Sequence, residues 1–365
     1  MDIEQLEEQV KLNCTISDAR FWGYYSICGL LLRLRELYRS EKNLMPWDAI
    51  PKEEITAWIA DTEAKWKSLE NESFRPLEIA GTSYDPFDVE RLNAILNQEG
   101  LVYGGGYGRF NKPTFSLATL ERTREVYDYL VYYSGREFCR DLTTSAAMLQ
   151  GRCIFVRLDA VKNLLWDKLP EMQGKRCSGL LNEAFSSSGI EGTERGQDLS
   201  VKIDALASRV AELLVLHEIG EAFEDEYSDE WREILSGNVE RSAEFYVRGV
   251  KDVLADTSEK GPLRNIVDGR DKTLLYFHIA FLDAIRKEIF PELMSAFLRF
   301  SDCGDWLLLE DARRVGYRRA EQLMQSILGL WQVGEPKKIV PFIKQTLAEL
   351  PLQNCARKPT DLAVG

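Results

Sequence analysis

Apolar residues recur at the spacing of an α-helix through most of the chain, and this pattern restricts the possible folds more than any other feature. Each such helix carries an apolar stripe that must be buried against another element. The pattern predicts helices at about 17–42, with Ser17 as N-cap, and at about 51–69, 120–139, 201–227, 229–236, 239–255, 271–289, 291–300, 310–331 and 336–349. We therefore expect a mostly α fold, a compact all-α protein built like a multi-helix bundle.

Residues 72–116 differ from this pattern, because Pro76, Pro86 and Pro113 divide them and a glycine-rich run begins at Tyr103. We expect an irregular Gly/Pro-containing segment here, with one short helix at about 87–98 and room for a small hairpin. The resulting division is an N-terminal helical region over 1–116, a main helical domain over 117–350 and a tail over 351–365. The first two can equally form one continuous domain.

The charge of the chain excludes one class of function. It has 46 basic and 59 acidic residues, a net charge of −13, which argues against a general nucleic-acid binder because such proteins need a basic face.

The seven cysteines are scattered and form no C-x-x-C pair, which is typical of reduced thiols in a cytoplasmic protein. The acidic N-terminus lacks the features of a signal peptide, and the longest apolar runs are too short to span a membrane. We expect a soluble, cytoplasmic protein that can form homo-oligomers.

The stretch Leu216–Ala222 reads Leu-His-Glu-Ile-Gly-Glu-Ala and contains one of only two histidines in the chain. On a helical wheel, His217 and Glu221 fall inside the apolar stripe of their helix, and Glu218 lies toward its edge. A buried carboxylate must be neutralised, paired or bound to a metal, because desolvating an isolated charge costs several kcal/mol or more. The pattern indicates a buried polar centre.

The second histidine, His278, also lies in a strongly apolar helical stretch, at about 271–289. Two histidines on two apolar stripes suggest one shared site. A single histidine on an apolar face is more often a core residue whose hydrogen bonds are satisfied, so the argument depends on both histidines and the adjacent glutamates together.

The segment from Leu216 to Ala222 resembles the zinc-binding helix of the zincin metalloproteases, whose H-E-x-x-H motif supplies two zinc ligands and a glutamate base. It departs from that motif because Glu221 occupies the position of the second histidine. Since glutamate also binds zinc, a mixed site remains open, with His217, Glu221 and His278 as metal ligands and Glu218 as catalytic base.

Two other metal chemistries use similar residues. Carboxylate-bridged di-iron proteins hold their metals with histidines and glutamates on bundle helices, although their Glu-x-x-His pairs do not occur around His217 or His278. A further alternative is a magnesium site for phosphate chemistry, although a helical wheel does not place all of its five glutamates on one surface. These glutamates are Glu218, Glu221, Glu224, Glu240 and Glu244.

The glycine-rich run from Tyr103 to Pro113 is the second candidate site. Its glycines permit close backbone approach, and Arg109 and Lys112 are positioned to meet an anion, so a small-molecule or acidic ligand is a candidate partner. The alternative is a tight loop packed by its own aromatic residues.

The functional expectation is therefore a metal-dependent enzyme, a hydrolase in preference to a di-iron oxidoreductase, using divalent zinc, iron, manganese or magnesium. The competing hypothesis is a non-catalytic helical interaction or scaffold protein in which the same residues form a buried polar network.

Overall fold

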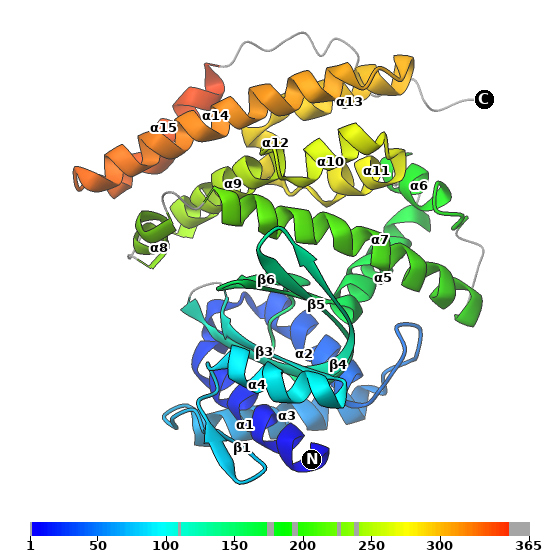
Figure 1. Ribbon diagram of the computed structural model, residues 1–365, viewed down its shortest axis with the longest axis vertical. Coiled ribbons are helices and arrows are strands. Elements are labelled where there is room, and N and C mark those ends of the chain that lie inside the picture. The colour runs from blue at the N-terminus through cyan, green and yellow to red at the C-terminus, as the bar shows by residue number, and fades with distance from the viewer. Residues whose placement is uncertain are drawn as a thin grey trace. The chain divides into compact units, whose positions relative to one another are not determined.

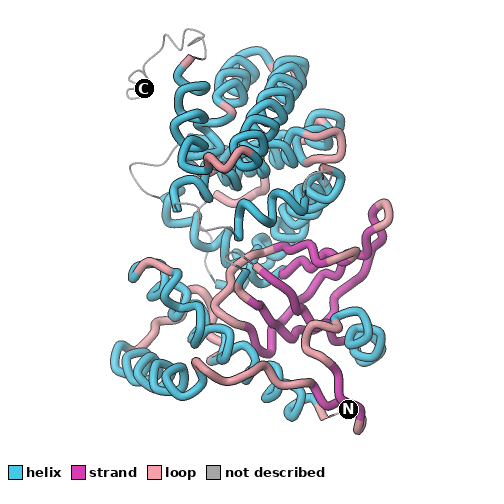
Figure 2. Tube along the Cα trace, turned by 90° about the vertical axis from the view of Figure 1, so that its left-hand side faces the viewer, coloured by secondary structure: helices cyan, strands magenta, loops and turns pink. Residues whose placement is uncertain are grey.

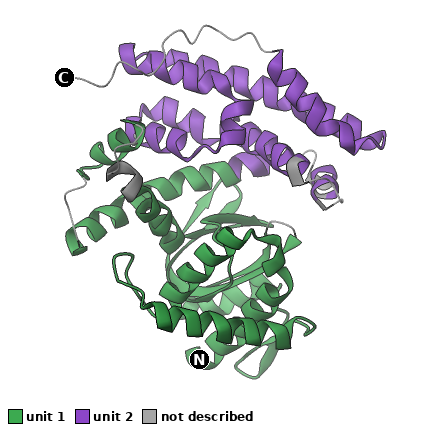
Figure 3. Cartoon of the chain, turned by 180° about the vertical axis from the view of Figure 1, so that it is seen from behind, with its two compact units in different colours: residues 1–218 green, residues 219–365 purple. Residues whose placement is uncertain are grey.

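The computed structural model describes residues 2–108, 111–173, 179–191, 196–224, 228–236 and 241–349. The chain forms two compact units, residues 1–218 and 219–365 (Figure 3). The tail expected over 351–365 lies outside the described residues.

Unit 1 begins with helices. α1 (Ile3–Phe21) starts after Asp2, whose side chain accepts a hydrogen bond from the Gln5 backbone, and a 3-10 turn (Trp22–Tyr24) separates it from α2 (Ile27–Glu41). The expected helix start at Ser17 is wrong, because Ser17 is buried inside α1 and donates a hydrogen bond to the Pro113 carbonyl. The helix expected at 51–69 is confirmed as α3 (Lys52–Leu69), which follows Pro51.

A curled five-stranded sheet forms the middle of unit 1 (Figure 2). The strand order is β3-β4-β5-β7-β6, and all neighbours are antiparallel except β5 and β7, which are parallel. The strands are β3 (Leu101–Tyr107), β4 (Pro113–Val126), β5 (Tyr129–Arg140), β6 (Ala147–Gln150) and β7 (Cys153–Arg157), and a separate hairpin pairs β1 (Leu77–Ile79) with β2 (Thr82–Tyr84). The expectation of an all-α, bundle-like protein is therefore wrong.

The helix expected at 120–139 is instead a long hairpin of β4 and β5. Residues 121–125 in the outer half of β4 are exposed on both faces, whereas most of its inner half is buried, so neither half alternates between apolar and polar residues as a half-buried strand does. The three tyrosines and the one valine of β5 pack well in a sheet, which favours a strand.

The glycine-rich run forms most of β3 rather than a loop. A Cβ atom at Gly105 would lie 2.9 Å from the Pro86 backbone oxygen, and one at Gly104 would lie 2.7 Å from the Ser116 hydroxyl. These glycines therefore allow neighbouring chain segments to approach β3 closely.

The core of unit 1 lies between the sheet and its helices. Leu6, Val10 and Cys14 of α1 pack with Phe115 and Leu117 of β4. α4 (Val89–Leu96) packs against β3 and is followed by a 3-10 turn (Asn97–Glu99). Three further helices follow the sheet: α5 (Leu158–Gln173), which packs on β5, α6 (Gly179–Ser186) and α7 (Gly196–Phe223).

The described part of unit 2 is helical, as expected for this part of the sequence (Figure 1). Its helices are α8 (Ser228–Ser236), α9 (Arg241–Thr257), α10 (Pro262–Gly269), α11 (Lys272–Phe281), α12 (Ala284–Ile289), α13 (Pro291–Cys303), α14 (Leu307–Gln332) and α15 (Ile339–Ala348), with a 3-10 turn at Pro336–Lys338. α9 and α14 pack against each other and against most of the other helices of the unit. Among the described residues, no helix is both long and apolar enough to cross a membrane.

Candidate metal centre on α7 and α9

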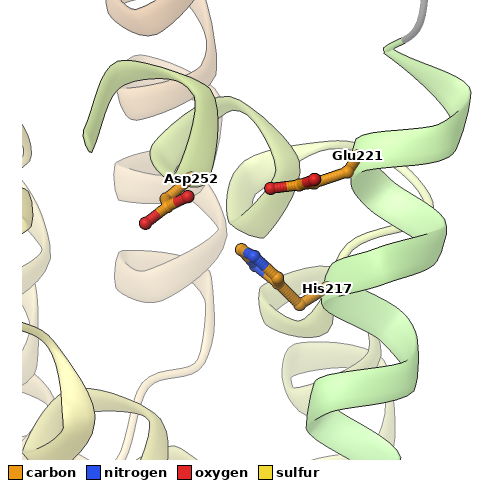
Figure 4. Close-up of side chains that lie close together, drawn as sticks. All are labelled: His217, Glu221 and Asp252. Carbon is orange, nitrogen blue, oxygen red and sulfur yellow. The ribbon is translucent and has the colours of Figure 1, made fainter. Parts of the chain in front are cut away.

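The motif identified in the sequence lies in the last turns of α7, a continuous helix within which the division between the units falls, after Glu218. His217 and Glu221 are four residues apart and therefore share one face of this helix. Figure 4 shows both side chains extending from α7 toward Asp252, which α9 supplies.

These three side chains form the one group in the described part of the chain that is close enough to share a metal ion. Each offers a ligand atom, and the three atoms lie within 4.8 Å of one another. All three residues are half-buried, so the group is partly desolvated without being closed to solvent. One imidazole and two carboxylates are ligand types that zinc, iron(II) and manganese(II) accept.

A lysine from α9 compensates part of the negative charge of the two carboxylates in this group. Lys251 Nζ lies 2.8 Å from Glu221 Oε2, and the exposed fractions of the two side chains are 34% and 19%. Lys251 immediately precedes Asp252, so one turn of α9 presents both a cation and a carboxylate to the end of α7. A metal ion must compete with this ammonium group for Glu221.

Glu218, the expected catalytic base, lies outside the group of three. Its Oε2 accepts a hydrogen bond of 2.8 Å from the Leu149 backbone N–H in β6, within unit 1. This bond supplies an edge strand of the sheet with an acceptor and ties Glu218 to the sheet.

His278, the expected third ligand, is not part of the group either. It is buried in α11, and its Nε2 lies 4.0 Å from Asp256 Oδ2. Arg286 Nη1 also lies 3.5 Å from the same carboxylate oxygen. Asp256 follows Asp252 by one turn of α9, so the two histidines are associated with successive carboxylates of that helix.

Lys112, expected to meet an anionic ligand, binds two carboxylates of the protein. Its Nζ lies 2.8 Å from both Asp18 Oδ1 and Asp141 Oδ1, and 3.3 Å from the Thr143 hydroxyl. Lys112 is 3% exposed. Arg109, its expected companion, lies outside the described residues.

This buried triad strongly perturbs its carboxyl groups. Burial, together with the charge of Asp141, raises the pKa of Asp18 to about 6. Burial also acts to raise the pKa of Asp141, but the Lys112 ammonium and the hydrogen bonds from Thr143 and the Phe115 backbone lower it overall. The triad connects α1, the start of β4 and the segment after β5.

The glutamates of the magnesium alternative have separate partners. Tyr317 donates a hydrogen bond to Glu224, with 3.0 Å between its hydroxyl and Oε2, and Arg248 Nε lies 2.9 Å from Glu244 Oε1. Glu240 lies outside the described residues. In the described part of the chain, these glutamates form no common group close enough to share an ion.

Two family models match the chain, one over residues 5–157 and the other over residues 162–349. They describe the N-terminal and C-terminal domains of a family of unknown function, DUF6866. The chain belongs to the DUF6866 family. The N-terminal match ends with the last residue of β7, and the C-terminal match begins within α5. No curated protein and no solved structure matches this DUF6866 chain.

Asp252 is the member of the group in this DUF6866 chain that sequence reasoning missed. The sequence predicts its helix, but the candidate ligands on that helix are Glu240 and Glu244 rather than Asp252. The four-residue spacing of Asp252 and Asp256 could have identified Asp252 as a candidate ligand. It places two carboxylates on one face of a helix that is otherwise rich in buried valines.

Proposed function

We propose that this protein is a metal-dependent enzyme that binds a divalent transition-metal ion through His217, Glu221 and Asp252. The observation that supports this proposal is the convergence of three ligand atoms within 4.8 Å, from two turns of α7 and one turn of α9. With a neutral imidazole, the group carries two negative charges, which match a divalent cation.

Hydrolysis is the reaction class that this ligand set favours. Catalytic metal sites commonly have three protein ligands and leave a coordination position for water, whereas structural zinc sites are closed by four. A metal ion held by these residues would lower the pKa of a bound water toward neutrality and so would supply a nucleophile. The partial burial of the three side chains agrees with an open site of this type.

Metal analysis of the full chain, purified without a histidine tag, tests the proposal. Isothermal titration with Zn²⁺, Mn²⁺ and Fe²⁺ should show one site, and both His217→Ala and Asp252→Asn should weaken binding at least about tenfold, a loss of about 1.4 kcal/mol. Asp311→Asn removes an exposed carboxylate of α14 and is the matched control. If wild-type protein binds none of these ions, the proposal is wrong.

One observation favours the competing hypothesis of a non-catalytic scaffold. The Lys251–Glu221 ion pair compensates Glu221 without any metal, as in a structural polar network. In that case, His217→Ala would lower the melting temperature, and neither the wild type nor the variant would bind metal. Measuring the melting temperature with and without metal distinguishes the two functions.

A further inference from the structure

A cavity of about 510 Å³ lies in unit 1 beside the tip of the β4–β5 hairpin, far along the sequence from the metal centre. α4 contributes Glu90 and Ala94 to its wall, and the hairpin tip contributes Glu125 and residues 127–130. Arg152, just before β7, and Cys153, the first residue of β7, complete it together with Tyr132 of β5. Its size is within the range of small-molecule sites in proteins.

The charges around this cavity are unbalanced. Glu90, Glu125 and Asp128 line it, and in the described structure none of the three makes an ion pair or a side-chain hydrogen bond. Arg152 is the single basic residue of the lining. The cavity therefore has a formal charge of −2, three acidic groups against one basic group, which attracts cations and repels anions.

Aromatic rings line the same cavity as these charges. Tyr127, Tyr129 and Tyr132 all line the cavity. Tyr132 is 6% exposed and stacks on Phe155, with 5.2 Å between ring centroids. Burial raises the pKa of the Tyr132 phenol, so the ring stays neutral at physiological pH. A neutral phenol ring attracts a cation through its face, with about 0.5–2 kcal/mol for each well-placed contact.

The arrangement of the carboxylates excludes a simple metal site. Among the described residues, only His217, Glu221 and Asp252 bring three ligand atoms within reach of one ion, so Glu90, Glu125 and Asp128 do not converge in this way. Carboxylates that do not converge, in a cavity that is also lined by aromatic rings, fit a ligand whose positive charges are themselves separated by an apolar chain.

We propose that this cavity binds a small organic cation with amine or guanidinium groups on an aliphatic chain. Its charged groups pair with the carboxylates of Glu90, Glu125 and Asp128, and its methylene groups pack on the tyrosine rings. Desolvating an aliphatic chain between aromatic rings adds affinity that an inorganic cation does not gain.

Isothermal titration of the full chain with spermidine and agmatine tests this proposal, with hexanediol as an uncharged control ligand. At least one cation should bind with one site per chain, and hexanediol should not bind. The double variant Glu125→Gln/Asp128→Asn should weaken binding about tenfold, since each exposed charge pair contributes about 0.2–1 kcal/mol. Arg152→Gln should strengthen binding, because it removes the one repelling charge.

The matched control is Asp61→Asn/Glu63→Gln, which removes two exposed carboxylates of α3 and should leave the affinity unchanged. The proposal is overturned if neither cation binds at millimolar concentration, if hexanediol binds equally well, or if both double variants weaken binding to the same extent. That last result would indicate attraction by the net charge of the whole protein rather than by this cavity.

Discussion

Gly220 of α7 lies so close to Ala255 of α9 that a Cβ atom at position 220 would lie 2.4 Å from the Ala255 carbonyl oxygen. This oxygen belongs to the backbone of a buried helix and has little freedom to move. The glycine within the His217–Glu221 motif therefore permits the close approach of the turns that carry Glu221 and Asp252.

Gly220→Ala should destabilise the protein by about 1–3 kcal/mol, the usual cost of overpacking a tight core contact. Gly329→Ala in α14 is the matched control, since a Cβ atom there meets nothing within 4 Å. Alanine should stabilise that helix by about 0.5–1 kcal/mol. Urea denaturation measures both changes, and equal effects of the two substitutions would contradict the packing argument.

Lys251→Met should increase the affinity for metal about tenfold, because it removes the ammonium group that competes for Glu221. Titration with Zn²⁺ measures this change. If the cluster is only a structural network, the same substitution leaves Glu221 without its lysine and lowers the melting temperature, with no gain in metal binding.

Asp18→Asn should stabilise the protein at pH 7 but not at pH 4. Between the ordinary pKa of 3.8 and the folded value of about 6, the folded protein holds a proton that the unfolded chain has released. Stability contributed by this group therefore falls as the pH rises through that window, by up to about 3 kcal/mol at 1.36 kcal/mol per pKa unit. Denaturation curves at pH 4 and pH 7 measure the difference, and a constant gap would refute the assignment.

Glu137→Gln should cost about 3–5 kcal/mol, because it leaves buried arginines without their carboxylate. Glu137 Oε1 lies 2.5 Å from Arg157 Nε, and Glu137 Oε2 lies 3.2 Å from Arg140 Nε. Burial opposes ionisation, but Arg157 and then Arg140 lower the pKa of Glu137 overall. Its stabilising effect is present above about pH 4.5 and is lost as the pH falls through the lower, folded pKa, so the variant should show weaker acid dependence than wild type.

Tyr127→Asn should stabilise the β4–β5 hairpin by about 1 kcal/mol. Tyr127 occupies the two-residue turn with a φ of 53°, in the left-handed region that costs a non-glycine residue about 1–2 kcal/mol and that asparagine tolerates better. The melting temperature should rise while the affinity of the neighbouring cavity for cations falls. A variant with a lower melting temperature would show that the contacts of the tyrosine ring stabilise the protein by more than the left-handed backbone conformation destabilises it.

The sequence predicted the helices well where each has one apolar face, as in α3 and α14, because the 3.6-residue period is then visible. It failed for β4 and β5. The inner half of β4 is largely buried on both faces and its outer half is exposed on both, so no alternation marks the strand. The glycines of β3 indicated a loop, although in the structure they allow neighbouring chain segments to pack closely against the strand.

The candidate site was only partly predictable for a related reason. The four-residue spacing of His217 and Glu221 follows from one helix, and the structure places both in one group with Asp252. The partner helix depends on tertiary packing, which the periodicity of a single sequence does not encode. The same limit applies to Lys112, whose partners are Asp18 and Asp141, far from it in the chain.

The contact between Asp18 and Leu142 has a consequence for biosynthesis. The Leu142 backbone N–H donates to Asp18 across a separation of 124 residues. At about 5–20 residues per second, a ribosome needs about 6–25 s to add that length of chain. During that interval Asp18 lacks this hydrogen-bond donor, so α1 cannot make all of its final contacts before Leu142 has been synthesised.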